Sequence, residues 1–465
     1  RGLGKGDRLA MQAAKSPEAL ALYLGCVRAG VILLPLNTAY TPDEMTYFIE
    51  DAAPKLVVMD PGAEGALTSA AQAVGAGMLT LDADGDGTLT EALTGVSEVA
   101  EPTPCNGDDL ACLLYTSGTT GRSKGAMLTQ GNLVSNARAL VAAWRFAPGD
   151  VLLHALPIFH AHGLFVACNV AMASGASMIW QTAFDTEDVI AALPEATVMM
   201  GVPTFYTRLL AAPGFTREVA GPMRLFTSGS APLLAEAHAA FLARTGHAIL
   251  ERYGMTETGM NTSNPYEGER RAGTVGAPLP QVELRVTDPE TGDALTEGAT
   301  GMIEVRGPNV FKGYWNMPEK TAEELRADGW FITGDLGVMD PDGYVTIVGR
   351  EKDLIISGGY NVYPREVEAL LDDQPGVAES AVIGLPHPDF GEGVVAVVVP
   401  EKGAKPDLDA IAGTVTARLA NYKRPKRYLL RPALPRNTMG KVQKNALRAA
   451  YSELFTAPDA VKAGE

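Results

Sequence analysis

Apolar strand-like segments alternate with helix-like segments along most of this 465-residue chain. Residues 17–29 have the pattern of a helix, with Pro17 in its first turn. Residues 55–60, 110–115 and 197–202 have the pattern of buried strands, and a helix-like segment follows the last of them. Because strands that alternate with helices form largely parallel sheets covered by helices, the chain is predicted to have a mixed α/β fold.

The pattern changes twice toward the C-terminus. Residues 281–348 contain short strands separated by turns, which predicts a β-rich subdomain. A compact segment with its own helices and strands, the latter near 381–383 and 394–399, follows. We therefore predict a large N-terminal domain, residues 1–349, of mixed sheets with packed helices and the β-rich subdomain. A small, mobile α+β domain is predicted for residues 350–465.

Charge is unevenly distributed along the chain. With 38 basic and 55 acidic residues the net charge is −17, which argues against nucleic acid as the main partner. Residues 350–465 are nearly balanced, with 16 basic and 15 acidic residues, and Asn421 to Arg448 holds nine basic residues and no acidic one. This basic run is either a solvated face or a site for a small polyanion such as a nucleotide.

Cysteine usage and hydropathy favour a protein of a reducing compartment, and the cytoplasm is predicted. No CxxC spacing occurs, so neither a metal site nor a disulfide framework is predicted, and a reducing compartment is favoured. The four cysteines are Cys26, Cys105, Cys112 and Cys168. Residues 151–184 contain no charged residue, but Pro157 and several polar residues interrupt them, so a buried core segment is predicted rather than a membrane span.

A loop rich in glycine and hydroxyl groups follows the apolar residues 110–115. It reads Tyr115-Thr-Ser-Gly-Thr-Thr-Gly-Arg-Ser-Lys124-Gly125. Glycines let backbone N–H groups approach an anion closely, hydroxyls add donors, and Lys124 adds charge, so the loop suits a phosphate group. It is not a Walker A loop, because Ser123 and Gly125 stand where that motif has glycine and a hydroxyl residue.

Three shorter motifs suit the rest of a nucleotide. Tyr253-Gly-Met-Thr-Glu257-Thr places a carboxylate beside a hydroxyl just after the strand-like residues 248–250. One carboxylate near phosphates suits a weakly held Mg²⁺, although a lone glutamate is more often a surface acid. Thr333-Gly-Asp335 and Gly349-Arg350 are predicted to end two strands and to bind ribose hydroxyls, the alternative for each being an ordinary turn.

Together these motifs resemble the adenylate-forming superfamily of acyl-CoA synthetases, adenylation domains and beetle luciferases. The resemblance runs from about Gly6 to Leu447, and the few tens of residues that the family usually has before the Gly6-Asp7-Arg8 region are absent here. Further segments resemble the family's aromatic-histidine segment, adenine loop, hinge, pantetheine-tunnel segment and catalytic-lysine loop. These are, in order, 157–163, 228–233, 349–353, 358–359 and 435–441.

The resemblance implies a role for each matching residue. The ATP-binding residues would be Thr116, Ser117, Gly118, Thr119, Thr120, Gly121, Lys124, Gly229, Ser230, Ala231, Pro232, Tyr253, Gly254, Met255, Thr256, Asp335, Arg350 and Lys441. Among them Tyr253 would stack on adenine opposite residues 229–232, and Asp335 and Arg350 would bind ribose. Lys352 would be the hinge, and Gly358 and Gly359 would bind coenzyme A.

The catalytic residues implied by the resemblance are Lys441, Glu257, Thr256 and Lys124, with Glu257 also ligating Mg²⁺. A substrate carboxylate would attack the α-phosphorus of ATP to give an acyl-adenylate and pyrophosphate, and a thiol would then displace AMP. Lys441 would bridge the attacking carboxylate and the α-phosphate, while Thr256 touches that phosphate. The charge of Lys441 and Mg²⁺ would offset the repulsion between two anions. The basic run would suit the phosphates of coenzyme A.

The acid is predicted to be malonate or methylmalonate. The chain resembles malonyl-CoA synthetases in residues 200–210 and 253–265. Arg208, the only charge between Thr197 and Ala212, is predicted to bind the distal carboxylate in a closed pocket. The alternative is an arginine whose stem lies along apolar surface with its head in water. His160 and Ser228 are the other predicted acyl-site residues. The alternatives are a stand-alone adenylation enzyme, a CoA ligase for another small acid and a non-catalytic nucleotide-binding protein. No nucleic-acid or membrane partner is expected, and monomer and dimer stay open.

Overall fold

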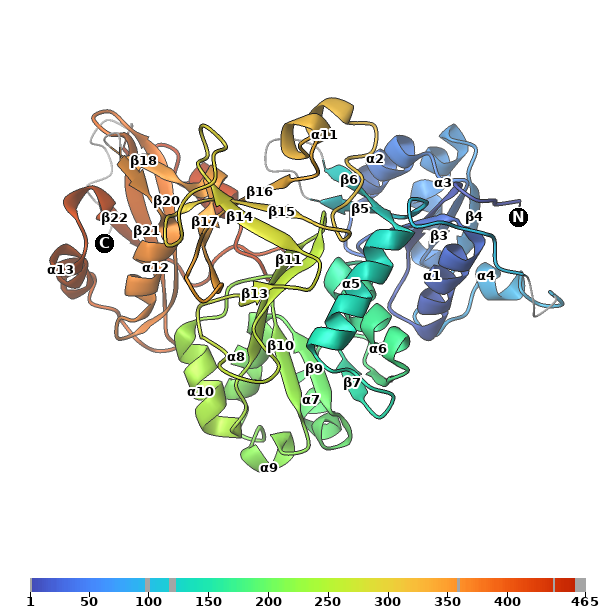
Figure 1. The fold of residues 1–465 in the computed structure, drawn as a ribbon, viewed down its shortest axis with the longest axis horizontal. Coiled ribbons are helices and arrows are strands. Elements are labelled where there is room, and N and C mark those ends of the chain that lie inside the picture. The colour runs from blue at the N-terminus through green and yellow to red at the C-terminus, as the bar shows by residue number, and fades with distance from the viewer. Residues whose placement is uncertain (1, 97–100, 117–122, 358–359, 438–439, 456–465) are drawn as a thin grey trace. The chain divides into compact units, whose positions relative to one another are not determined.

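The computed structural model describes residues 2–96, 101–116, 123–357, 360–437 and 440–455. The chain divides into two compact units, the first of residues 1–284 and 304–332 and the second of residues 285–303 and 333–465. The mixed α/β architecture, with a large N-terminal part and a smaller C-terminal part, confirms the predicted fold class (Figure 1). The predicted domain boundary at residue 350 lies within the second unit and stays a prediction.

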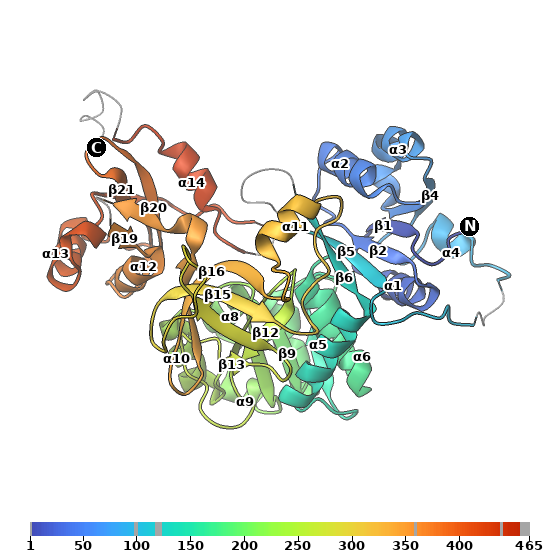
Figure 2. The ribbon, with the colours of Figure 1, turned by 45° about the horizontal axis from the view of Figure 1, so that its top comes forward.

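A six-stranded sheet is formed by the first part of the chain. Its strands, in spatial order, are β4 (Gly77–Thr80), β3 (Leu56–Met59), β1 (Arg8–Gln12), β2 (Ile32–Pro35), β5 (Leu110–Thr116) and β6 (Lys124–Thr129). All pairs are parallel except β5 with β6. Figure 2 shows α2 (Pro42–Ala52) and α3 (Glu64–Ala73) on one face and α1 (Pro17–Ala29) on the other, while α4 (Thr88–Glu91) follows β4. The predicted helix at 17–29 is confirmed.

A seven-stranded sheet follows in the same unit. Its strands, in spatial order, are β13 (Ala277–Pro278), β12 (Gly259–Ser263), β11 (Leu250–Met255), β10 (Leu225–Ser228), β9 (Val198–Gly201), β7 (Val151–His154) and β8 (Ser177–Trp180). The accompanying helices are α5 (Gln130–Ala143), α6 (Asn169–Ser174), α7 (Thr186–Ala192), α8 (Pro203–Ala211), α9 (Arg217–Ala220) and α10 (Ala235–Thr245). Aromatic side chains of α8, β10 and α10 form its core, namely Tyr206, Phe226 and Phe241.

The uncharged residues 151–184 form β7, a π-helical turn (His162–Cys168), α6 and β8, and every residue of the π-helical turn is buried. Most of residues 152–171 are buried, whereas residues 172–184 are half-buried or exposed. The predicted buried core segment is therefore confirmed for its first part only. In the part of the chain that the structure describes, no helix is both long and apolar enough to cross a membrane.

Two smaller sheets complete the chain. The third sheet has the order β14 (Glu283–Thr287), β15 (Gly301–Arg306), β16 (Phe331–Met339) and β17 (Val345–Arg350), and α11 (Pro318–Glu324) precedes β16. The fourth has the order β19 (Tyr360–Val362), β18 (Ile355–Ser357), β21 (Gly391–Pro400) and β20 (Val377–His387), with β22 (Arg427–Leu430) also paired to β21. Its helices are α12 (Pro364–Asp372), α13 (Leu408–Arg418) and α14 (Lys444–Ala450).

The fourth sheet is covered on both faces, which explains its continuous apolar strands. Val394, Ala396 and Val398 pack with residues of α12 and α13, whereas Val395 and Val397 pack in the cluster that contains Leu447 of α14. Successive side chains of a strand point to opposite faces, so a strand buried on both faces needs apolar residues at every position.

Two predicted strand ends are wrong, and one is confirmed. β11 continues through Tyr253, Gly254 and Met255, so the first half of this motif lies within a strand and only the half from Thr256 onward follows it. Asp335 lies in the middle of β16, because β16 pairs along its whole length with neighbouring strands. Gly349-Arg350 does end β17.

The antiparallel strands β11 and β12 approach each other so closely at Gly254 that no side chain fits there. A Cβ atom on Gly254 would lie 2.1 Å from the carbonyl oxygen of Gly259 and 2.8 Å from the Cα atom of Met260. The register of the pair also shifts between Tyr253 and Gly254. Backbone atoms cannot move away as the end of a flexible side chain can. This close strand pairing therefore requires glycine at position 254.

We expect Gly254→Ala to lower the free energy of unfolding by about 1–3 kcal/mol, because the added methyl group overlaps backbone atoms. Gly65→Ala in the first turn of α3 is the matched control, since a Cβ atom there meets nothing within 4 Å. That control should be neutral or stabilising by up to about 1 kcal/mol. Chemical denaturation of both variants measures the difference in the free energy of unfolding. Wild-type stability in Gly254→Ala would contradict the requirement for glycine at this position.

Candidate active site

Lys124, the predicted phosphate-loop lysine, begins β6 directly opposite Thr116 at the end of β5. Its Nζ atom lies 3.2 Å from Oε1 of Glu324 and 4.1 Å from the centre of the Tyr314 ring. Neither partner was identified from the sequence. The predicted residues Ser117, Gly118, Thr119, Thr120 and Gly121 lie outside the described residues.

Glu257 is buried, with 6% of its surface exposed, so the alternative of a surface acid is wrong. It lies in the turn between β11 and β12, and its carbonyl oxygen accepts a hydrogen bond of 2.8 Å from the backbone N–H of Phe311. The hydroxyl of Tyr314 donates to Oε1 of Glu257 over 3.0 Å. The turn therefore holds the carboxylate inside the first unit.

The donor set around Glu257 fits a metal that is shared with a ligand. Among the described residues, no group of three or more His, Cys, Asp or Glu side chains could hold a metal ion by itself. Mg²⁺ commonly binds one or two carboxylates and completes its shell with phosphate oxygens and water. Glu257 fits that mode of binding.

The residues predicted to flank adenine come from two neighbouring strands. Tyr253 is half-buried on β11, and its hydroxyl lies 3.8 Å from Sδ of Met255. After β10, Ser230 has a φ of 69°, and its hydroxyl lies 3.3 Å from Nδ1 of His162. Of the other predicted residues, Gly229 is buried, Thr256 and Ala231 are half-buried, and Pro232 is exposed.

Arg252 is the residue that the sequence analysis missed. Only 3% of its surface is exposed, and its Nε and Nη2 atoms have no hydrogen-bond partner among the described residues. Burial lowers the pKa of Arg252 to about 10, so the guanidinium stays charged at neutral pH. The charges that directly follow the strand-like residues 248–250 were the available signal, because charges that a strand buries require a partner.

Further polar atoms lie around Arg252. A Cβ atom on Gly229 would lie 2.3 Å from Nη1 of Arg252, so the guanidinium packs against that glycine. Burial, followed by the charge of Arg252, lowers the pKa of His162, whose Nε2 atom has no partner in the described structure. The hydroxyl of Ser228, a predicted acyl-site residue, is likewise buried without a described partner. His162 and Gly229 thus lie close to the Arg252 guanidinium.

Arg208 lies elsewhere than the closed pocket predicted for it. It is in the last turn of α8 and is exposed to solvent. On that helix the buried side chains are Pro203, Tyr206 and Leu209, so position 208 falls on the outer face. His160 is half-buried, and its Nδ1 accepts a hydrogen bond of 3.3 Å from the backbone N–H of His162.

The predicted residues of the second unit gather around one ion pair. Asp335 and Arg350 are direct partners in the register of β16 and β17, and Nε of Arg350 lies 2.6 Å from Oδ1 of Asp335. Loss of hydration, followed by the charge of Arg350, lowers the pKa of Lys441, and Asp335 and Lys352 also act on it. Lys352 lies in a 3₁₀ turn (Glu351–Asp353), and its hinge role stays a prediction. Gly358 and Gly359 lie outside the described residues.

Several residues of the basic run are paired within the second unit. These ion pairs are Lys423–Glu366, Arg436–Glu379, Lys444–Glu368 and Arg448–Asp353. Their charges are balanced by carboxylates of the fold. The run therefore serves the packing of this unit as well as any anion that it binds.

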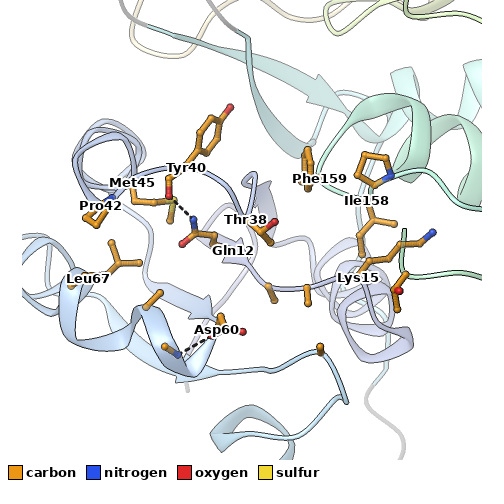
Figure 3. Close-up of a pocket in the computed structure, with 18 residues that line it drawn as sticks. Gln12, Lys15, Thr38, Tyr40, Pro42, Met45, Asp60, Leu67, Ile158 and Phe159 are labelled. Carbon is orange, nitrogen blue, oxygen red and sulfur yellow. Dashed lines mark hydrogen bonds between the residues drawn. The ribbon is translucent and has the colours of Figure 1, made fainter. Parts of the chain in front are cut away.

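A cavity of about 630 Å³ in the first unit is separate from these residues. Figure 3 shows it between the first sheet and the loop that carries Ile158 and Phe159. Lys15 lines it but donates to the carbonyl oxygen of His154 over 2.8 Å. Its lining includes residues 157–159 of the predicted aromatic-histidine segment, but none of the individually predicted site residues.

Comparisons with known proteins identify the family of the chain. The sequence pattern of the AMP-binding enzyme family matches residues 1–315, and that of the AMP-binding enzyme C-terminal domain matches residues 366–441. A feruloyl-CoA synthase of Amycolatopsis sp is 37% identical over 97% of this chain and 90% of its own length. A malonate–CoA ligase of Arabidopsis thaliana is 35% identical over 96% of this chain and 78% of its own length.

A solved structure is more similar still. The ATP-bound crystal structure of MatB from Rhodopseudomonas palustris has a TM-score of 0.97 and 59% sequence identity, covering 98% of this chain and 90% of that one. The buried Glu257, the Lys124 position and the Asp335–Arg350 pair lie in a fold shared over almost the whole chain. The chain thus belongs to the AMP-binding enzymes, and within them to the adenylate-forming acyl-CoA ligases.

Proposed function

We propose that this enzyme joins malonate or methylmalonate to coenzyme A, using ATP and Mg²⁺. An acyl-adenylate and pyrophosphate form first, and the thiol of coenzyme A then displaces AMP. The observation that carries the choice of acid is Arg252, a buried guanidinium with two nitrogen atoms that have no hydrogen-bond partner among the described residues. A dicarboxylate has one carboxylate for the reaction and a second one for Arg252.

Burial removes water from the charged guanidinium of Arg252. A buried charge without a partner is unfavourable by several kcal/mol, and the fold tolerates it here without a described carboxylate at Nε or Nη2. A carboxylate that binds there gains a charge-assisted, two-pronged contact and relieves that cost. A monocarboxylate leaves the guanidinium unpaired, so the same residue disfavours acetate and longer fatty acids.

The similar proteins support a CoA ligase, but they do not by themselves decide which acid it uses. MatB and a malonate–CoA ligase are similar to this chain, but so is a feruloyl-CoA synthase. Arg252, with His162 nearby, is the feature of this chain that favours a second carboxylate.

The reaction brings together negatively charged groups. Lys124 and Lys441 are proposed to offset the charge of the phosphates, with Lys441 acting where the carboxylate oxygen approaches the α-phosphorus. Glu257 would hold Mg²⁺, which supplies further charge neutralisation when bound. Asp335 and Arg350 would bind the ribose, and Tyr253 would pack on the adenine. The unpaired part of the basic run would meet the phosphates of coenzyme A.

The proposal is tested by thioester formation with malonate, methylmalonate, succinate, acetate and octanoate. We expect Arg252→Met to lower kcat/KM for malonate by about 30-fold to several thousand-fold, because truncation leaves the substrate carboxylate unpaired. Acetate or butyrate should improve relative to malonate. Arg252→Lys should restore part of the activity, because it keeps the charge but loses the planar fork.

Arg208→Leu is the matched control for Arg252→Met, since it also removes one arginine, from an exposed position. It should stay within about threefold of the wild type, as surface substitutions usually do. Thermal unfolding of each variant checks that it is folded. Full malonate activity in Arg252→Met, or a large loss confined to Arg208→Leu, would reject the assignment. Transfer to a carrier-protein thiol but not to coenzyme A would identify a stand-alone adenylation enzyme.

Lys441 is expected to act in only one of the two half-reactions. Lys441→Ala should suppress pyrophosphate release by about 10²–10³-fold, as the loss of a transition-state donor does. Thioester formation from chemically prepared malonyl-AMP should be much less affected, because no attacking carboxylate approaches a phosphate in that step. Equal slowing of both half-reactions would show a different role.

A further inference from the structure

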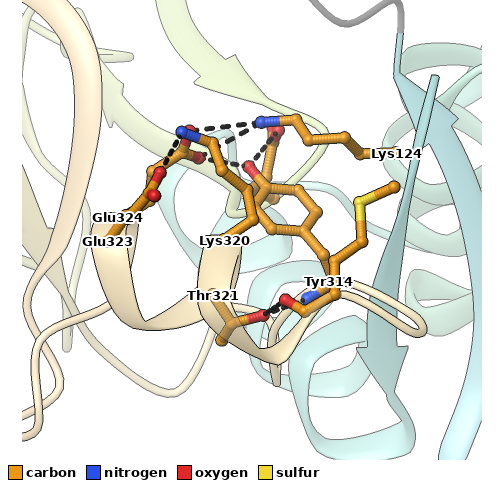
Figure 4. Close-up of polar contacts among 8 residues, drawn as sticks. Lys124, Tyr314, Lys320, Thr321, Glu323 and Glu324 are labelled. Carbon is orange, nitrogen blue, oxygen red and sulfur yellow. Dashed lines mark hydrogen bonds and ion pairs between the residues drawn. The ribbon is translucent and has the colours of Figure 1, made fainter. Parts of the chain in front are cut away.

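A cluster of charged and hydroxyl groups surrounds Glu324, the last residue of α11. Both Lys124 and Lys320 contact its carboxylate, with Nζ atoms 3.2 Å and 3.0 Å from Oε1 (Figure 4). The hydroxyl of Tyr314 donates to Oε2 of Glu324 over 2.6 Å and also lies 3.0 Å from Glu257. We call Lys124, Glu257, Tyr314, Lys320 and Glu324 the Glu324 cluster.

The backbone fixes this cluster in place. Tyr314 forms a β-bridge with Ala126 of β6, and its backbone N–H donates to Oγ1 of Thr321 on α11 over 2.9 Å. Its ring is 2% exposed and packs against Phe311. The strand that begins with Lys124 and the helix that ends with Glu324 are therefore held to the same tyrosine.

Glu324 carries a negative charge at neutral pH. Burial would raise its pKa, but hydrogen bonds from Tyr314 and Lys320 and the charge of Lys124 lower it overall. Tyr314 has one hydroxyl proton and two carboxylates within reach, the nearer one being that of Glu324. An added anion near Lys124 must therefore compete with a carboxylate that belongs to the protein.

We propose that Glu324 is a positioning residue that holds Lys124 and sets the affinity for ATP by competing with the ATP phosphates for that lysine. The inference rests on the proposed function, in which Lys124 binds those phosphates. Two effects of Glu324 act in the same direction. It shares the charge of Lys124, and its own charge repels the phosphates.

The test measures the dissociation constant of ATP by calorimetry, without any carboxylic acid, so that no turnover occurs. Glu324→Gln keeps the size of the side chain and an oxygen for Tyr314, but it removes the charge. We expect ATP to bind about threefold to tenfold more tightly, the range of a partly buried ion pair. A residue that only stabilised the fold would weaken ATP binding when replaced.

Glu323→Gln is the matched control, because Glu323 is the neighbouring residue on α11 and also pairs with Lys320, at 2.7 Å. It is much more exposed than Glu324, and it pairs with Lys320 rather than with Lys124 among the described residues. Its dissociation constant for ATP should stay within about twofold of the wild type. Glu324→Ala is a second variant in case Glu324→Gln unfolds, with tighter binding again expected.

The outcomes separate this inference from the proposed function. If the wild type binds ATP and both folded Glu324 variants bind it equally or more weakly, the competition is overturned while the proposed function stands. Tightening in Glu323→Gln to the same extent would also overturn it, because the effect would then be general to the charge of α11. A wild-type enzyme that fails to bind ATP would reject both.

Discussion

The close pairing of β11 with β12 determines where most of the site in the first unit lies. Because Gly254 admits the carbonyl of Gly259 at a distance that no Cβ atom allows, the chain turns back tightly after Met255. That turn carries Glu257 into the interior, while the strand before it carries Arg252 and Tyr253. Residues with different chemistry thus reach one region because a single strand pair fixes their spacing.

Two buried charges of this region differ in whether the described protein supplies them with hydrogen-bond partners. Glu257 has Tyr314 as a described hydrogen-bond donor, and Tyr314 is itself tied to β6 and α11. Arg252 has no described partner at Nε or Nη2, and burial lowers its pKa. A satisfied buried charge stabilises a geometry, whereas an unsatisfied one is unfavourable until a ligand pairs with it. The second arrangement favours recognition over stability.

In the second unit, strand register brings the predicted site residues together. Asp335 and Arg350 are 15 positions apart in the sequence yet directly opposite on β16 and β17. Their ion pair lies among the charges that act on Lys441. Antiparallel pairing of neighbouring strands makes such an arrangement precise, because the register fixes which residues face each other.

The sequence by itself determined the fold class, the helix at 17–29, the buried strands and the motifs of an AMP-binding enzyme. These are encoded locally, by apolar periodicity, capping residues and glycine-rich turns. Only the tertiary structure decided that Arg208 is exposed and Arg252 is buried. Each lies in a largely apolar segment, Arg252 beside Glu251, and the local pattern does not show which face packs inward. It alone joined Lys124 to Glu324, 200 positions away, since such contacts depend on packing between elements that no local pattern records.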